Sequence, residues 1–214
     1  MKITLLSEDS IRLEGAEGPL SIEAESCAAC GLGAVYYKSG RTEAAEQAFK
    51  RSMSLDPGDA CAYQQAGRMY YELGCYQDAV AALIQAIKLN PNASDYLYLG
   101  NAYIYLAQFE AATNAYQGAL SLDPSSANAY RQLGFAYGHL RRLTESARAF
   151  RQAIRLRPDD AEAMQALAVV YLALGDEPAA LAQYAALRQF DQQRATRLLE
   201  IIRAVHAQRA GTHS

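Results

Sequence analysis

Three cysteines near the amino terminus are the residues whose type and spacing could do chemistry. Cys27 and Cys30 form a Cys-x-x-Cys pair, and Cys61 follows at the position equivalent to Cys27 in an internal repeat. A Cys-x-x-Cys pair can be redox-active or can supply two of the four ligands of a zinc ion. No second pair of this kind occurs, and the three histidines lie far along the chain. We interpret the cysteines as small structural residues. A redox or metal role for the three thiols is the alternative.

The remaining polar residues show no pattern that catalysis requires. The sequence has no Ser, His and Asp arrangement typical of nucleophilic hydrolases, no glycine-rich phosphate loop and no cluster of histidines. We therefore predict that the chain is not an enzyme, and that it uses no cofactor and no catalytic or structural metal.

Arginines gather on one predicted helix in the second half of the chain. Arg148, Arg151 and Arg155 are three and four residues apart, so a helix places them on one face. The simpler interpretation is a face exposed to water. The alternative is a surface for an acidic partner or for the acidic amino-terminal segment of a second copy of the chain.

The elements that position these residues come from an internal repeat. Successive steps of 34, 33 and 34 residues separate Pro57, Pro91, Pro124 and Pro158. A small residue recurs in register at Gly33, Gly67, Gly100, Gly134 and Ala168. An aromatic residue recurs at Tyr36, Tyr70, Tyr103, Tyr137 and Tyr171. A period of this length is the signature of a helical solenoid, in which each repeat buries its apolar face against the next.

The recurring residues suit a pair of antiparallel helices. Gly67 and Ala79 lack bulk, so two helices can approach closely there, and Leu83 fills the space around that contact. Pro91 has no N–H group and ends the second helix. Polar residues that follow the prolines are predicted to be the N-caps of the next helices, namely Asp59, Asn92, Ser126 and Asp160.

The order of a large apolar residue, Gly, Tyr, a small residue and Pro resembles the tetratricopeptide repeat (TPR) family. The resemblance implies an all-α fold, a right-handed superhelical solenoid of about five helix pairs with a carboxy-terminal capping helix. The repeats are expected at residues 26–59, 60–92, 93–126, 127–160 and 161–190. The fifth departs from the pattern at Ala168, Leu187 and Gln192, which is typical of a solenoid end.

The two ends of the chain lie outside the repeats. Three early segments alternate apolar and polar residues as strands do, namely Lys2–Leu6, Ser10–Glu14 and Leu20–Ala24. Turn residues separate the last two segments, so we predict a β-hairpin-like acidic leader over residues 1–25. It either covers the first repeat or pairs with a partner. Residues 191–209 are predicted to form the capping helix, and residues 210–214 a disordered tail.

In the TPR family the first helices of the pairs line a concave groove, and the resemblance implies which residues face it here. The ten candidates are Tyr37, Gln64, Arg68, Tyr71, Leu97, Asn101, Tyr105, Asn128, Arg131 and Phe135. His139, Glu162, Gln165 and Val169 are expected on the same face. Such a surface suits an extended peptide, because amides bond its backbone, arginines bind its carboxylates and aromatic rings contact its apolar side chains. The alternative is the ordinary surface of a spacer.

Composition narrows the class of protein. Of the 214 residues, 51% are hydrophobic, and no run of 18 apolar residues occurs, so we expect no membrane span. The first ten residues do not resemble a signal peptide, and four cysteines without a disulfide pattern favour a reducing cytoplasm. The net charge of −3 argues against nucleic acid as the main partner.

Three hypotheses of function follow. The first is a non-catalytic cytoplasmic scaffold or adaptor whose groove holds a peptide segment of a protein partner. The second is a platform that assembles head to tail into a homo-oligomer, because residues 1–126 carry a net charge of −7 and residues 127–214 one of +4. The third is a thiol-based sensor or metal protein that uses Cys27, Cys30 and Cys61.

Overall fold

A computed structural model describes the backbone of residues 2–7, 10–14 and 22–211, and side chains from residue 25 to residue 207. Within these ranges the chain forms two strands and eleven helices. It divides into two compact units, unit 1 (Met1–Leu106) and unit 2 (Ala107–Ser214). Within the described residues, no helix combines the length and the apolar character needed to cross a bilayer.

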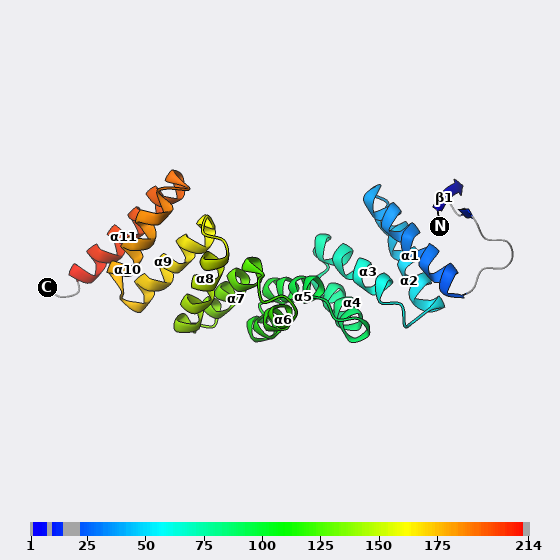
Figure 1. Ribbon diagram of the computed structural model, residues 1–214, viewed down its shortest axis with the longest axis horizontal. Coiled ribbons are helices and arrows are strands. Elements are labelled where there is room, and N and C mark those ends of the chain that lie inside the picture. Colours follow the sequence, from blue (N-terminus) through cyan, green and yellow to red (C-terminus); the bar gives the residue numbers. More distant parts are fainter. Residues whose placement is uncertain (1, 8–9, 15–21, 212–214) are drawn as a thin grey trace. The chain divides into compact units, whose positions relative to one another are not determined.

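Unit 1 begins with a hairpin and continues with five helices (Figure 1). Strand β1 (Lys2–Ser7) pairs antiparallel with β2 (Ser10–Glu14), so that Lys2 lies opposite Glu14. The helices are α1 (Ile22–Lys38), α2 (Thr42–Leu55), α3 (Ala60–Glu72), α4 (Tyr76–Leu89) and α5 (Ala93–Tyr105). Helices α1 and α2 form one antiparallel pair, and α3 and α4 form the next.

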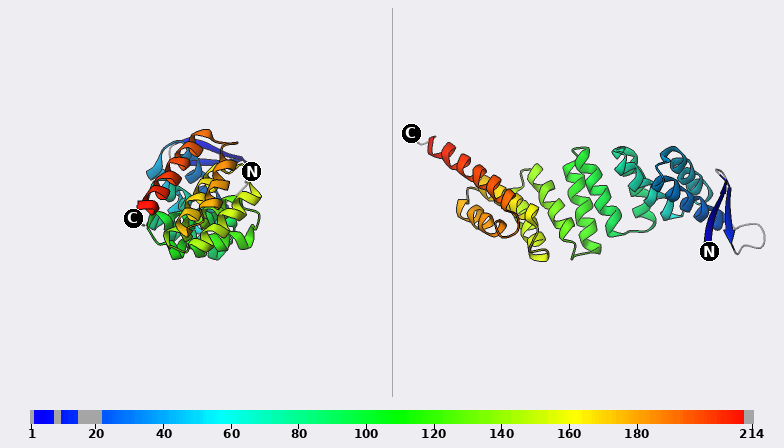
Figure 2. Two further views of the ribbon diagram at one scale, coloured as in Figure 1. Left: turned by 90° about the vertical axis from the view of Figure 1, so that its left-hand side faces the viewer. Right: turned by 90° about the horizontal axis from the view of Figure 1, so that it is seen from above.

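Unit 2 contains the other six helices, and Figure 2 shows both units from two further sides. They are α6 (Phe109–Leu122), α7 (Ala127–His139), α8 (Leu143–Leu156), α9 (Ala161–Leu174), α10 (Glu177–Leu187) and α11 (Gln192–Gly211). Helices α7 and α8 form one pair, α9 and α10 form the next, and α11 packs on α9 and α10. The predicted fold of stacked helix pairs with a final packed helix is confirmed.

The leader contains a β-hairpin, as predicted, but its third segment differs from the prediction. The hairpin joins the first two predicted strand segments, whereas the predicted turn at residues 15–19 lies outside the described residues. The third segment was expected to be a strand, but the chain is helical from Ile22 onward. Glu23, Ala24 and Glu25 are good helix formers that continue directly into the first repeat, and this explains the early start of α1. Helix α11 extends to Gly211, and the rest of the predicted tail lies outside the described residues.

The two helices of a pair are in close contact at the recurring glycine. A Cβ atom on Gly67 would lie 2.7 Å from Leu83 Cγ and 3.3 Å from the Leu83 backbone nitrogen. A Cβ atom on Gly134 would lie 2.8 Å from the ring of Phe150, which is buried. The Ser146 hydroxyl donates to the Gly134 carbonyl oxygen at 2.7 Å, which joins α8 to α7 across the same contact. The small residues are therefore required by packing, as the sequence indicated.

All four predicted N-caps are confirmed. The side chain of Asp59 accepts from the backbone N–H of Cys61, and that of Asn92 accepts from Asp95. In unit 2, Ser126 caps α7 and Asp160 caps α9 in the same way. Each cap satisfies one of the N–H groups that a helix leaves unpaired in its first turn.

The turn between the helices of each pair uses the left-handed backbone region. Gly74 and Gly175 adopt it with φ of 78° and 86°. At the equivalent positions of two other repeats stand Ala107 and Arg141, with φ of 57° and 61°. Residues with a Cβ atom meet a steric cost there, so these two turns carry strain that the glycine turns avoid.

Two glycines of α7 give a matched test of this packing. We expect Gly134→Ala to lower the free energy of unfolding by about 1–3 kcal/mol, because the new methyl group meets the buried Phe150 ring. We expect Gly138→Ala to raise it by about 0.5–1 kcal/mol, because the nearest atom is Ser146 Oγ at 3.6 Å and alanine favours the helix. Urea denaturation followed by circular dichroism measures both. Equal effects of the two variants would contradict the close contact.

Candidate functional site

Four tyrosines from three helices form an aromatic cluster in unit 1. They are Tyr71 on α3, Tyr76 at the start of α4, and Tyr98 and Tyr105 on α5. The rings of Tyr76 and Tyr105 stack with centroids 4.4 Å apart, and Tyr71 meets the edge of Tyr98 at 5.4 Å. The side chain of Tyr105 is 61% exposed. The tyrosine cluster therefore presents a preformed aromatic surface to solvent.

The sequence identified half of this cluster. Tyr71 and Tyr105 were predicted, whereas Tyr76 and Tyr98 were missed. A signal for Tyr76 was present, because Phe109 occupies its equivalent position in the next repeat. Phe109 stacks on His139 with centroids 4.4 Å apart, and His139 is the equivalent of Tyr105. The first residue of a second helix thus contacts the end of the following first helix in both units.

Burial and neighbouring polar groups raise the pKa of two predicted tyrosines of this face, Tyr71 and Tyr37. Burial, followed by the electrostatic effect of the Tyr105 phenol, raises the pKa of Tyr71 to about 12. Burial and a hydrogen bond donated to the Glu72 carboxylate raise the pKa of Tyr37 to about 12. Both side chains are therefore neutral hydrogen-bond donors across the physiological pH range.

The other predicted residues of unit 1, Gln64, Leu97 and Asn101, are half-buried on α3 and α5.

Arg68 binds a carboxylate that belongs to the chain itself. Its Nη2 atom lies 3.1 Å from Oδ1 of Asp95, whose side chain is completely buried in the first turn of α5. Asp95 also accepts from the side-chain amide of Asn92, which in turn caps the backbone N–H of Asp95. This is a reciprocal capping arrangement with an arginine from the preceding repeat added to it. Arg68 therefore helps to hold the beginning of α5 against α3.

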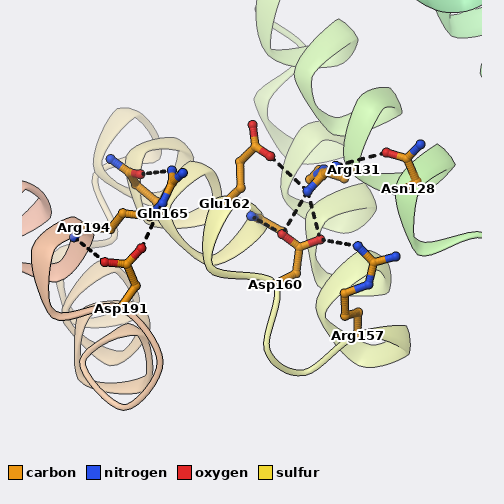
Figure 3. A network of polar contacts seen from close by, with 9 residues as sticks. Asn128, Arg131, Arg157, Asp160, Glu162, Gln165, Asp191 and Arg194 are labelled. Carbon is orange, nitrogen blue, oxygen red and sulfur yellow. Dashed lines mark hydrogen bonds and ion pairs between the residues drawn. The ribbon is translucent and has the colours of Figure 1, made fainter.

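Arg131 has the same role in unit 2 (Figure 3). Its Nη1 atom lies 3.3 Å from Oδ1 of Asp160 and 2.9 Å from Oε2 of Glu162, and Nη2 donates to Asn128 at 3.1 Å. Asp160 is buried and caps α9. The predicted residues Asn128 and Arg131 are thus brought together. The prediction that Arg68 and Arg131 bind carboxylates of a partner stays a prediction, and each already binds at least one carboxylate of this chain.

A cavity of about 500 Å³ lies between α7, α8 and α9 of unit 2. Phe135 and Phe150 meet edge to face at 5.0 Å and form part of its lining with Val169. His139, Glu162 and Gln165, which the sequence placed on the same face as Phe135, also border it. Arg141 and Arg194 add positive charge at the cavity. No signal in the sequence pointed to Arg194, because it lies on α11, beyond the repeats.

The arginines of α8 border a second cavity. Arg148, Arg151 and Arg155 are exposed, and together with Gln183 of α10 they line a space of about 490 Å³. The predicted single face is confirmed by this arrangement. The side-chain oxygen of the neighbouring Gln152 is buried without a hydrogen-bond partner among the described residues.

Two of the three thiols are in direct contact. Cys61 occupies the position equivalent to Cys27 in the repeat, and the structure places its sulfur 2.8 Å from that of Cys30. Cys30 is buried, and Cys27 and Cys61 are exposed. Among the described side chains, no group of three His, Cys, Asp or Glu residues could hold a metal ion.

The buried Asp95 allows a test of the role of Arg68. We expect Arg68→Ala to lower the free energy of unfolding by about 2 kcal/mol, because it leaves a buried carboxylate without its cation. In the Asp95→Asn background the same substitution should cost much less. Thermal denaturation of the four proteins in this cycle measures the coupling. Additive effects would contradict a structural role, and exposed Arg148→Ala serves as the control without effect.

The comparisons with known proteins show the fold and the family. A search of curated protein sequences gave no match. Among solved structures, the crystal structure of MamA protein is 23% identical with a TM-score of 0.75, over 80% of this chain and 94% of that one. YrrB, described as a TPR protein with an unusual peptide-binding site, is 20% identical with a TM-score of 0.75, over 82% and 92%. TTC0263, a thermophilic TPR protein from Thermus thermophilus, is 25% identical with a TM-score of 0.55, over 85% and 99%.

The likeness to MamA and YrrB shows the fold alone at this level of identity. The family is shown by a sequence comparison instead. The model of the cilia and flagella-associated protein 70 C-terminal domain matches residues 4–214, which is nearly the whole chain. The chain therefore belongs to the family of the cilia and flagella-associated protein 70 C-terminal domain, and its repeats are tetratricopeptide repeats.

Proposed function

We propose that this chain is a non-catalytic protein-interaction scaffold that holds a peptide segment of a partner against the first helices of its repeats. The observation that carries the proposal is the cavity between α7, α8 and α9. Its volume of about 500 Å³ falls within the range of pockets that bind small molecules or side chains. It lies on the face that carries Phe135 and Val169, two residues that the family resemblance assigns to the binding groove.

The chemistry of the cavity indicates what a partner must offer. Phe135, Phe150 and Val169 give an apolar lining, so a large apolar side chain can replace water there. Arg141 is exposed beside the lining and can pair with a carboxylate. We therefore infer a segment in which an apolar anchor residue is followed or preceded by an acidic residue.

The tyrosine cluster of unit 1 supports a second contact of the same kind. Tyrosine is among the residues that contribute most to binding energy at interfaces, because its ring is large and its conformational entropy is low. Tyr105 is exposed, and it is held by stacking on Tyr76 and so is positioned before binding. The likeness in fold to YrrB supports peptide binding as a function that this architecture can perform.

The free cysteines support a reducing, cytoplasmic setting.

The first test uses peptides selected from a random library by the wild-type protein. We expect Tyr105→Ala to weaken the affinity for peptides that bind unit 1 about tenfold, and Val169→Glu to do the same for peptides that bind unit 2. A loss of this size is typical when an anchor contact is removed. Fluorescence polarisation measures the dissociation constants. We chose these residues rather than Arg68 or Arg131, because the two arginines support the fold.

Two exposed leucines outside these surfaces give matched controls. Leu89 on α4 and Leu174 on α9 are 42% and 45% exposed. Leu89→Ala and Leu174→Glu should leave binding unchanged. If the controls weaken binding as much as the test variants, or if none of the four does, the proposed surfaces are wrong.

The arginine cavity on α8 favours a second candidate function, head-to-tail self-assembly. Residues 1–25 contain six acidic and two basic residues, so the leader of one copy complements the Arg148, Arg151 and Arg155 face of another. Contacts between different surfaces of two copies generate rings or filaments rather than a two-fold dimer.

Salt tests this second function, because attraction between exposed charges is screened. We expect assemblies larger than a monomer at about 50 mM salt and monomers at about 500 mM salt, where the Debye length is much shorter. Reversing the charges with Arg148→Glu, Arg151→Glu and Arg155→Glu should abolish assembly at low salt. Sedimentation equilibrium measures the mass. A monomer at both salt concentrations would exclude this function.

A further inference from the structure

Two thiols from neighbouring repeats are in direct contact in unit 1. Cys30 lies in the middle of α1, and Cys61 lies in the first turn of α3. Their sulfur atoms are 2.8 Å apart, so a disulfide of about 2.05 Å needs the sulfurs to approach by less than about 1 Å. Peptide binding requires no such contact between thiols. The thiol pair is therefore independent of the binding surfaces proposed above.

The two cysteines differ in access to solvent. Cys30 is only 2% exposed, whereas Cys61 is open to solvent. An oxidant can therefore reach Cys61 and not Cys30. A buried thiol beside an exposed one is the arrangement in which one cysteine reacts first and the other completes a disulfide.

The surroundings of Cys61 favour its thiolate. The hydrogen bond from the Cys30 thiol, with the nearby Arg68 guanidinium, lowers the pKa of Cys61 to about 7, against burial and the Asp59 carboxylate. The same hydrogen bond and burial raise the pKa of Cys30. Cys27 on α1 is the other thiol close to this pair. The lowered pKa increases the fraction of Cys61 that is thiolate, the state that reacts with oxidants.

We propose that Cys30 and Cys61 form a reversible disulfide when the protein meets a hydroperoxide. The Cys61 thiolate attacks the peroxide oxygen, the O–O bond breaks, and the leaving alkoxide or hydroxide takes up a proton. Cys61 becomes a sulfenic acid. The Cys30 sulfur then attacks the Cys61 sulfur, the S–O bond breaks, and the departing hydroxide takes the Cys30 proton as water. The two thiols lose two electrons and one hydroperoxide is reduced to an alcohol, or to water, with release of one water.

The disulfide would fasten two repeats to one another. Helices α1 and α3 belong to successive helix pairs and are in contact, so the bond crosses a boundary between repeats. Closing the loop between these residues restricts the unfolded chain, and the thermal midpoint should rise by about 10 °C. A small-molecule thiol such as dithiothreitol should reduce the disulfide and return the thermal midpoint to its original value.

The test is a titration of the reduced full-length protein with hydrogen peroxide, followed by intact-mass measurement and peptide mapping without reductant. We expect a loss of about 2 Da and a cross-linked pair of peptides that contain Cys30 and Cys61. Cys75→Ser and Cys27→Ser should behave as the wild type. Cys30→Ser should instead retain a sulfenic acid on Cys61, which dimedone labels. Circular dichroism establishes that each variant keeps its helical content.

A second readout is the pH dependence of alkylation by iodoacetamide under reducing conditions. The rate at Cys61 should rise with a midpoint near pH 7, and in Cys30→Ser the midpoint should move upward toward that of an ordinary thiol, about 8.5. Exposed Cys75, on the same protein, gives the reference. A cross-link that joins Cys27 to Cys61, disulfides only between molecules, or identical alkylation profiles for Cys61 and Cys75 would each overturn the proposal.

Discussion

The structure depends on how closely the two helices of a pair approach at the recurring glycine. Gly67 faces Leu83, and Gly134 faces Phe150, at distances that leave no room for a Cβ atom. Because the pair is that tight, its second helix is fixed relative to its first, and side chains of successive first helices come into reach of one another. The tyrosine cluster, the arginine contacts and the thiol pair all join the first helix of one pair to the first helix of the next or to its N-cap.

Polar contacts between repeats use this fixed geometry. Asp95 and Asp160 are buried at the beginning of α5 and α9, and an arginine from the preceding first helix reaches each of them. A buried carboxylate is costly without a partner, so each arginine is held in place by the fold. Arg68 and Arg131, which were predicted to bind carboxylates of a partner, are thereby part of the framework, and the proposed binding chemistry rests on exposed aromatic and apolar side chains.

The sequence predicted the fold well because its signals are local and repeated. Proline, glycine and the N-cap residues recur in register, so the same signal for a helix boundary occurs in several repeats. The leader was predicted less well, since alternation over a few residues does not decide which segments pair. Contacts between repeats were harder still. The partner of Arg68 is a buried Asp95, and the sulfur in contact with Cys61 is that of Cys30, because side-chain direction on each helix decides which residue meets the neighbouring helix. The repeat register places Ala107 and Arg141 at the turn position where other repeats have glycine, but it did not predict the left-handed backbone that these two residues adopt there.

The arginine contacts also change what counts as one unit of folding. The fourth sequence repeat ends at Asp160, yet Asp160 is the N-cap of the following helix, and Arg131 also pairs with Glu162, which belongs to the following repeat. A shortened chain that ended after α8, at Leu156, would keep every helix of the first four repeats and would lose both of these carboxylates. The cooperative unit is therefore a repeat together with the first turn of its successor. Boundaries for dissecting or recombining the repeats should be drawn after that turn rather than at the proline.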